Sequence, residues 1–188
     1  ADPRLRRDHA AALRQAGRPT ESAAILEALA EREADPDLLS NLGAARLAAD
    51  DPEGAMAALR RALVLAPGHR GANLHAGHAL QALGALEEAA AHHRRALAQD
   101  AAYLPALIGL ANVLHEIGDL AGADRAFAAA EQAAAGRPEQ PQLRWNRALH
   151  DLLAGRYAPG WDGYAWRWRI PDFPTPWRET GLPYWQGG

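Results

Sequence analysis

Three histidines are the residues whose type and spacing could do chemistry, because an imidazole binds metal ions and exchanges hydrogen bonds near neutral pH. His75 and His78 are three residues apart and would share one face of a helix, and His115 falls on the corresponding helix of the next sequence repeat. Three interpretations follow. The histidines form a metal site, although no carboxylate or cysteine completes one at a recognisable spacing. They form a polar patch that hydrogen-bonds the backbone of a partner's peptide, or they are solvated residues with no specific partner.

Signatures of other site chemistry are missing from the sequence. The chain has no cysteine, which excludes disulfides, thiol nucleophiles and cysteine-ligated zinc. It contains no GxGxxG, Walker, HExxH or GxSxG motif, and its carboxylates are scattered without a pair placed for acid–base catalysis. We therefore expect that this chain is not an enzyme and that it needs neither a cofactor nor a metal. That expectation does not extend to a larger parent protein.

Composition and charge restrict the class of partner. Hydrophobic residues make up 48% of the chain and charged residues 23%, as in soluble globular proteins. The net charge of −3 lacks the basic footprint of a nucleic-acid binder. No apolar run approaches the ~20 residues that span a bilayer, and the N-terminal stretch ADPRLRRDHA has no apolar signal core. We expect a cytoplasmic protein with a protein or peptide partner, and neither nucleic acid nor membrane.

Small residues recur along the chain at a fixed period, and this period defines the elements that carry the histidines. Glycine or alanine stands at Gly43, Gly77 and Ala111, which are 34 residues apart. Two further series of small residues hold the same period, namely Ala55, Ala89 and Ala123, and Ala62, Ala96 and Ala130. Each period is expected to fold into two amphipathic helices joined by a short turn, with the small residues where helices approach closely.

Two weaker units flank these three. The first is one residue short of the period and carries Ala10 and Gly17, and the last follows a three-residue insertion and carries Ala148 and Gly155. The sequence therefore predicts an all-α solenoid of about five helix–turn–helix repeats over residues 1–170. An extended aromatic and proline-rich segment, residues 171–188, would follow as a capping tail or as a linker to a missing domain. The repeats are expected near residues 3–35, 36–69, 70–103, 104–140 and 141–170.

This pattern resembles the tetratricopeptide repeat (TPR) family, whose period is 34 residues. The resemblance implies a superhelix in which the first helix of each repeat lines a concave groove that holds a peptide or a helix of a partner. Carried over position by position, it implies a groove lined by the following residues: Arg7, Asp8, Arg14, Ser40, Asn41, His75, His78, Gln81, Asn112, His115, Glu116, Trp145 and Asn146.

Two details of the groove bear on how it would bind. Asn41 and Asn146 hold the same repeat position, which is similar to the asparagine ladder of O-GlcNAc transferase, where amides grip a peptide backbone. The series is interrupted by Asp8 and by a histidine and a glycine in the third and fourth repeats. The two-carboxylate clamp of chaperone-binding TPR proteins needs lysines, and this chain has none. On a second helix, residues 92–95 are expected to be a solvated outer face, with contact to an acidic partner as the alternative.

Aromatic residues gather at the end of the last repeat. Four of the six tryptophans lie within residues 155–177. Because the last helix of a solenoid has no successor to cover it, a cap or a further packing layer must follow. We expect the tail to lie extended against an aromatic stripe on that helix, with stacking on a sugar as the alternative role. The predicted cap residues are Tyr157, Trp161, Tyr164, Trp168, Trp177 and Trp185.

The same region carries a narrower pattern, formed by Gly155, Tyr157, Gly160, Trp161, Tyr164, Trp166, Arg167 and Trp168, and then by Trp185, Gln186 and Gly187. It resembles bacterial proteins in which TPRs precede a glycosyltransferase-like domain. The first functional hypothesis is a protein–protein interaction scaffold that binds a peptide or helix in its groove. The alternative is the N-terminal, acceptor-recognising TPR region of a glycosyltransferase-like enzyme whose catalytic domain is absent here. A homo-oligomer formed through exposed solenoid ends is a further expectation.

Overall fold

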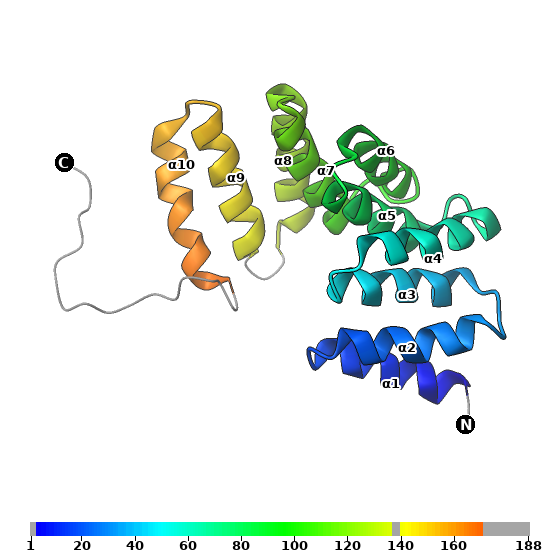
Figure 1. Ribbon diagram of the computed structural model, residues 1–188. Coiled ribbons are helices and arrows are strands. Elements are labelled where there is room, and N and C mark those ends of the chain that lie inside the picture. Colours follow the sequence, from blue (N-terminus) through cyan, green and yellow to red (C-terminus); the bar gives the residue numbers. More distant parts are fainter. Residues whose placement is uncertain (1–2, 137–139, 171–188) are drawn as a thin grey trace, which may run out of the picture. The chain divides into compact units, whose positions relative to one another are not determined.

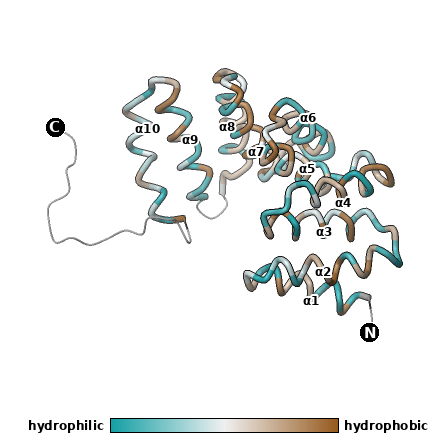
Figure 2. The backbone as a smooth tube through the Cα atoms, in the orientation of Figure 1, coloured by the Kyte–Doolittle hydropathy of each residue, from teal (hydrophilic) through white to brown (hydrophobic). Residues whose placement is uncertain are grey.

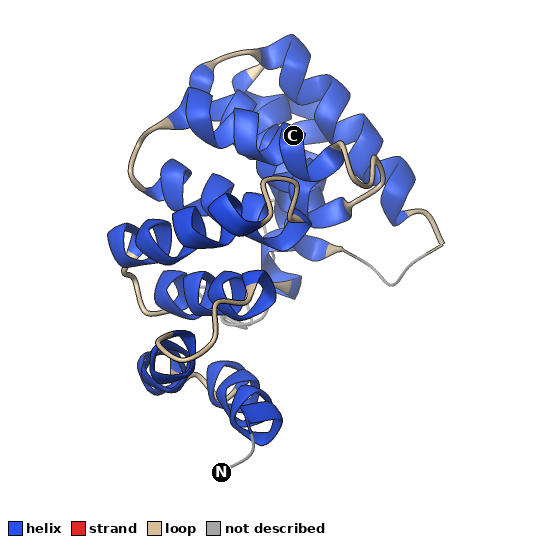
Figure 3. Ribbon diagram, turned by 90° about the vertical axis from the view of Figure 1, so that its right-hand side faces the viewer, coloured by secondary structure: helices blue, strands red, loops and turns tan. Residues whose placement is uncertain are grey.

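The computed structural model describes residues 3–136 and 140–170 of the chain. These residues form ten α-helices and one short 3-10 helix, and they contain no strand (Figure 1, Figure 3). They divide into two compact units, residues 1–135 and residues 136–188. The expectation of an all-α fold built from helix pairs is confirmed, whereas the predicted tail at 171–188 lies outside the described residues.

The first unit contains eight helices that pack as four successive pairs (Figure 1). Each odd-numbered helix packs against the even-numbered helix that follows it, and α2, α4 and α6 also pack against the first helix of the next pair. The helices are α1 (Pro3–Gln15), α2 (Pro19–Ala30), α3 (Pro36–Ala48), α4 (Pro52–Leu65), α5 (Arg70–Ala82), α6 (Leu86–Leu97), α7 (Leu104–Ile117) and α8 (Leu120–Ala134).

The odd-numbered helices form the inner layer of this unit. α1 contacts α3, α3 contacts α5 and α5 contacts α7, whereas in the described part of the unit no two even-numbered helices are in contact. Helices that touch on one side and are spread apart on the other form a curved stack, and the touching helices lie on its inside. We call this face of α1, α3, α5 and α7 the inner surface.

The second unit is a helix pair with a 3-10 turn at its end. It consists of α9 (Pro141–Leu153), α10 (Tyr157–Tyr164) and η1 (Ala165–Arg169), and α9 packs against both α10 and η1. Two glycines allow α10 to lie close to α9. A Cβ atom at Gly160 would be 2.7 Å from Leu152 Cδ2, and one at Gly163 would be 2.8 Å from Ala148 Cβ.

Short polar side chains fix where several helices begin. The Asp51 carboxylate accepts a hydrogen bond from the Gly54 N–H at 2.8 Å, and Asp119 accepts one from the Gly122 N–H at 2.9 Å. The turn between the two helices of a repeat needs a left-handed residue, which is glycine in four repeats and an aspartate in the second. These residues are Gly17, Asp50, Gly84, Gly118 and Gly155.

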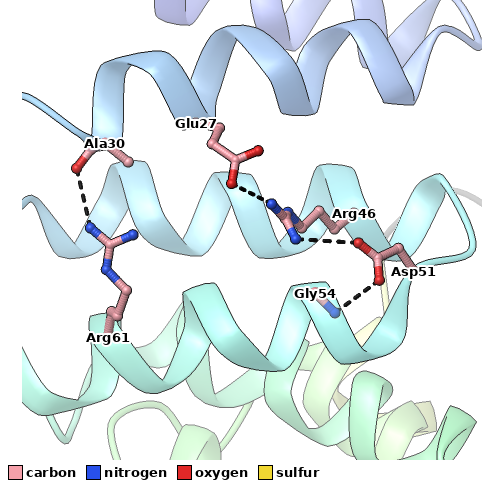
Figure 4. A network of polar contacts seen from close by, with 6 residues as sticks. All are labelled: Glu27, Ala30, Arg46, Asp51, Gly54 and Arg61. Atoms are coloured by element: carbon pink, nitrogen blue, oxygen red, sulfur yellow. Dashed lines mark hydrogen bonds and ion pairs between the residues drawn. The ribbon is translucent and has the colours of Figure 1, made fainter.

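Arginine side chains connect neighbouring helices across the outside of the core (Figure 4). Arg46 on α3 bonds to Glu27 on α2 and, at 3.3 Å, to the cap residue Asp51. Arg61 on α4 donates to the carbonyl oxygen of Ala30, which ends α2, at 3.2 Å. The three helices α2, α3 and α4 are therefore joined by polar contacts as well as by apolar packing.

The apolar core is thin and consists mainly of alanine and leucine. Hydrophobic residues are spread along the helices and are not gathered in one segment (Figure 2). Contact is closest where a small residue on the first helix of a repeat meets a large one on the second. A Cβ atom at Gly43 would be 2.5 Å from Leu59 Cγ, so glycine at this position is what lets α3 and α4 approach.

The third repeat places a histidine where its neighbours have an apolar residue. Leu59, His93 and Phe127 are 34 residues apart, and all three are buried. His93 lies between two glycines, because a Cβ atom at either Gly77 on α5 or Gly109 on α7 would be 2.5 Å from its Cε1 atom. Within the described part of the chain, neither ring nitrogen of His93 has a hydrogen-bond partner. Burial, reinforced by nearby histidines, lowers the pKa of His93 to about 3.

The expectation that residues 92–95 form a solvated outer face is therefore wrong for the two histidines. His93 is fully buried. The half-buried His92 ring shares a hydrogen bond of 2.9 Å with the side-chain oxygen of the buried Asn73. Only Arg94 and Arg95 are exposed. The 34-residue spacing between Leu59 and His93 indicates a core position for His93. The prediction was instead based on the four consecutive polar residues 92–95.

Adding one methyl group at Gly43 should destabilise the first unit. We expect Gly43→Ala to lower the free energy of unfolding by roughly 1–3 kcal/mol, because the new Cβ overpacks against Leu59. Gly68→Ala is the matched control, because the nearest side chain there is Gln99 at 3.2 Å, which can move. Urea unfolding followed by circular dichroism measures both, and equal effects would refute the close approach of α3 and α4.

Replacing His93 by leucine should make stability less sensitive to acid. Because the folded state lowers the pKa of His93, titration of this residue leaves the unfolding free energy unchanged above about pH 6.5. The unfolding free energy then decreases as the pH falls from 6.5 towards 3. The unchanged protein should therefore lose up to ~1.4 kcal/mol per pH unit more than His93→Leu over that range. Above pH 6.5 the variant should be more stable by roughly 1–2 kcal/mol, because two unpartnered ring nitrogens are removed.

Unfolding free energies measured at several pH values test this expectation. His9→Gln, at an exposed position on α1, is the control for loss of any histidine. If the unchanged protein and His93→Leu lose stability in parallel as the pH falls, His93 is not a buried neutral group.

Candidate partner-binding surface

A polar hollow of about 450 Å³ lies on the inner surface between α3 and α5. Its walls come from the start of α3, the start of α5 and the loops that precede α5 and α7. The residues that line it are Asp37, Ser40, Asn41, Gly68, His69, Arg70, Gly71, His75, Gln99 and Tyr103.

His69 connects the two helices that form the hollow. Its Nδ1 accepts a hydrogen bond from the Ala72 N–H at 3.0 Å, which caps α5. Its Nε2 lies 3.0 Å from Asp37 Oδ1 at the start of α3. Because Nδ1 accepts, Nε2 carries the proton and donates it to the Asp37 carboxylate. One side chain thus sets the start of α5 and its spacing from α3.

Arg70 holds the opposite rim of the hollow. Its guanidinium lies 3.3 Å from Asp100 Oδ2 and 4.5 Å from the centre of the Tyr103 ring. Asp100 also accepts a hydrogen bond from the Ala102 N–H at 3.1 Å, which orders the loop before α7. The Arg70 guanidinium is therefore paired with a carboxylate and also contacts an aromatic ring at the rim.

Three of the predicted groove residues meet in this hollow. Ser40 is buried on α3, Asn41 is exposed on α3, and His75 is half-buried on α5. Gly71 keeps the two helices close here, because a Cβ atom on it would lie 3.1 Å from Ser40 Oγ. The hollow thus presents a hydroxyl, an amide and an imidazole side by side, and all three can both donate and accept hydrogen bonds.

The histidines form a row that runs from the hollow into the core. The rings of His75 and His78 are 6.4 Å apart between centres, and those of His78 and His93 are 5.2 Å apart. Burial, together with the positive charges of His78, Arg14 and His69, lowers the pKa of His75 to about 4. Burial also lowers the pKa of His78. At neutral pH the row is therefore uncharged.

The other predicted groove residues of the first unit are partly occupied by contacts within the chain. Arg7 forms ion pairs with Glu33 at 2.9 Å and with Asp35 at 2.7 Å, which tie α1 to the loop before α3. Gln81 on α5 donates a hydrogen bond to Glu116 on α7. The remaining members are Asp8 and Arg14, which are exposed on α1, and Asn112 and His115, which are half-buried on α7. Their role in binding stays a prediction.

Trp145 and Asn146 belong to α9 in the second unit, where both are half-buried. Asn146 accepts a hydrogen bond from the Gln142 side chain at 2.8 Å.

The predicted cap residues also lie in this unit. Tyr157 and Trp161 are exposed on α10, while Tyr164 and Trp168 are half-buried. The other two, Trp177 and Trp185, lie outside the described residues, as does the end of the pattern shared with glycosyltransferase-associated proteins. That narrower resemblance therefore stays a prediction.

Two further site types find no support among residues 3–136 and 140–170. These residues contain no group of three histidine, cysteine, aspartate or glutamate side chains arranged to hold a metal ion. None of their helices combines the length and the apolar character needed to cross a membrane.

Sequence reasoning missed several residues of the hollow. His69, Arg70, Gln99 and Tyr103 lie at helix starts or in loops, outside the groove positions of the repeat. The sequence offers one signal for them, which is their place between the end of one repeat and the first helix of the next. Residues from this place line the hollow before both α5 and α7.

Comparison with known proteins defines the fold. No protein-family model matches the chain, and no curated protein matches it significantly.

Solved structures do match. A thermophilic TPR protein of Thermus thermophilus has a TM-score of 0.73 and 23% identity, covering 87% of this chain and 89% of that one. MamA of Desulfovibrio magneticus RS-1 has a TM-score of 0.71 and 19% identity, covering 87% and 91%. PilF of Pseudomonas aeruginosa has a TM-score of 0.72 and 19% identity, covering 87% and 74%. The chain therefore has the helical-repeat fold of TPR proteins.

Proposed function

We propose that this chain is a protein-interaction scaffold and that the inner surface of its first unit binds an extended peptide segment of a partner. The observation that carries the proposal is the meeting of Ser40, Asn41 and His75 in one hollow of about 450 Å³. They come from groove positions of two consecutive repeats. A hollow of this size accommodates a short stretch of extended chain with one side chain.

The chemistry of the hollow suits a peptide backbone. An extended backbone presents N–H and C=O groups alternately, so its partner must offer acceptors and donors together. The Asn41 amide offers both from one side chain, and the uncharged His75 ring offers one of each. At the rim, Arg70 is paired with Asp100, and Asp37 accepts a hydrogen bond from His69 Nε2. Hydrogen bonding is therefore expected to contribute more to binding than the net charge of the peptide.

The position of the hollow also favours this function. The inner layer is where α1, α3, α5 and α7 lie next to one another, so a single extended segment can meet several repeats in turn. Arg14, exposed on α1, and His78, half-buried on α5, are further polar residues of the inner helices. Likeness to TPR proteins supports a scaffold in general, and the hollow supports this particular surface.

Removal of the polar groups in the hollow should abolish peptide binding while the fold is retained. Peptides selected from a random extended-peptide library against the unchanged chain are the probes. We expect Asn41→Ala and His75→Ala each to weaken the selected peptides by ~10-fold or more, which corresponds to about 1.4 kcal/mol. Arg60→Ala and Arg94→Ala, exposed on α4 and α6, are the controls and should leave the affinity unchanged.

Fluorescence anisotropy gives the affinities, and circular dichroism confirms that each variant is folded. If the selected peptides bind Asn41→Ala and His75→Ala as well as the unchanged chain, the inner surface is not the binding surface. The same conclusion follows if the control variants lose as much affinity.

A further inference from the structure

An aromatic stripe runs along α10 and η1 in the second unit. It consists of Tyr157, Trp161 and Tyr164, whose spacing of four and three places them on one side of α10, and of Trp168, which follows in η1. Tyr157 is 65% exposed and Trp161 is 61% exposed. Trp161 contacts Tyr164 edge to face, with ring centres 5.5 Å apart. Large aromatic side chains this exposed and this regularly spaced are unusual on a surface that meets only water.

The repeats themselves show what normally covers this position. Counting through the repeats, Trp161 corresponds to Ala23, Met56, Ala90 and Asp124, at successive intervals of 33, 34, 34 and 37 residues. Ala23, Met56 and Ala90 are buried, and they lie on α2, α4 and α6, each of which packs against the first helix of the next repeat. Asp124 is half-buried on α8, the last helix of the first unit. This repeat position is therefore buried where the second helix of a repeat packs against a following helix. The exposed stripe on α10 occupies the same position, as expected of a surface that binds a helix.

Positive charges border the stripe. The Trp166 ring has the guanidinium of Arg144 on it at 4.7 Å and that of Arg169 at 4.5 Å. The Arg167 guanidinium lies 4.0 Å from the centre of the Tyr164 ring and 4.2 Å from that of Trp168. These stacking contacts fix the direction of the cations. α10 and η1 contain one acidic residue, Asp162. Positive charge therefore gathers at the η1 end of the stripe, where Arg167 contacts two of its rings and Arg144 and Arg169 contact the neighbouring Trp166.

We propose that this stripe binds an amphipathic α-helix of a partner protein, with the apolar side of the helix on Tyr157 and Trp161 and with its carboxylates facing Arg144, Arg167 and Arg169. The surface lies in the second unit, and its use does not depend on peptide binding at the inner surface of the first unit. The partner is thus an acidic amphipathic helix, defined by an apolar stripe and flanking glutamate or aspartate residues.

Two other occupants fit the observations less well. Residues 171–188 contain prolines at 171, 174, 176 and 183, so they include no proline-free run as long as α3, α5 or α7 and cannot supply such a helix. The extended cap that the sequence predicts for them lies outside the described residues. A second copy of the chain offers α1, whose Leu5 is 66% exposed although the corresponding Leu38, Ala72 and Ala106 are buried. However, α1 carries four arginines and one aspartate, and it would bring like charges to the cationic border.

Synthetic helices of the length of α7, 14 residues, test the proposal. One probe has a leucine–alanine stripe flanked by glutamates, and the second has the same stripe flanked by lysines. We expect the acidic probe to bind the full chain and the lysine probe to bind ~10-fold more weakly or not at all. Trp161→Ser and Tyr157→Ser should each weaken the acidic probe by ~10-fold. Leu153→Ser is the matched control, because Leu153 is 59% exposed on α9 and is not part of the stripe.

Fluorescence anisotropy of the labelled probes gives the affinities, and circular dichroism shows that the variants fold. Equal binding of both probes would overturn the acidic character of the partner. Equal loss in Leu153→Ser and Trp161→Ser would overturn the location. Sedimentation equilibrium of the chain alone tests whether a second copy of the chain occupies the stripe. Self-association that disappears in Trp161→Ser would show that a second copy is the occupant and would overturn the proposal.

Discussion

The structure depends on one steric constraint, which is the close approach of neighbouring helices where a side chain is small. Alanine and glycine bury little area, so an alanine-rich chain gains cohesion only if its helices lie close enough for backbone and short side chains to touch. Gly43 makes room for Leu59, while Gly77 and Gly109 together make room for His93. In the second unit the roles of the two helices are reversed, because Gly160 on the second helix meets Leu152 on the first. Each large residue fills a notch that only a missing side chain provides.

This constraint explains why a histidine can occupy the core of the third repeat. Two glycines face the His93 ring from α5 and α7, so its whole edge is enclosed by two helices of successive repeats. The row of rings from His93 through His78 to His75 then connects that enclosed site with the hollow on the inner surface. Because burial lowers the pKa of all three, the row contributes no charge at neutral pH. The packing of His93 between two glycines thus fixes both the core of the third repeat and one end of the uncharged histidine row that reaches its surface.

Much of this architecture could be predicted from the sequence because the repeat is local. Small residues at a 34-residue interval give the helix pairs, and the position within a repeat assigns Ser40, Asn41 and His75 to one surface. What the sequence could not give depends on contacts between residues far apart along the chain. Arg7 was expected to face a partner, and its ion pairs with Glu33 and Asp35 arise only when α1 meets the next loop. The bond from His69 to Asp37 spans 32 residues and likewise appears only in the folded unit.

The two candidate surfaces differ in the physical basis of their selectivity. In the hollow, Arg70 is paired with Asp100 and the His75 ring is uncharged, so a ligand is distinguished mainly by the geometry of its hydrogen-bonding groups. On the aromatic stripe, exposed rings supply apolar area and stacked guanidiniums supply charge. Added salt screens charges at an exposed surface and leaves neutral hydrogen bonds largely unaffected. Binding at the stripe should therefore weaken as ionic strength rises while binding at the hollow changes little. The two proposed surfaces would therefore distinguish two kinds of partner by chemistry alone.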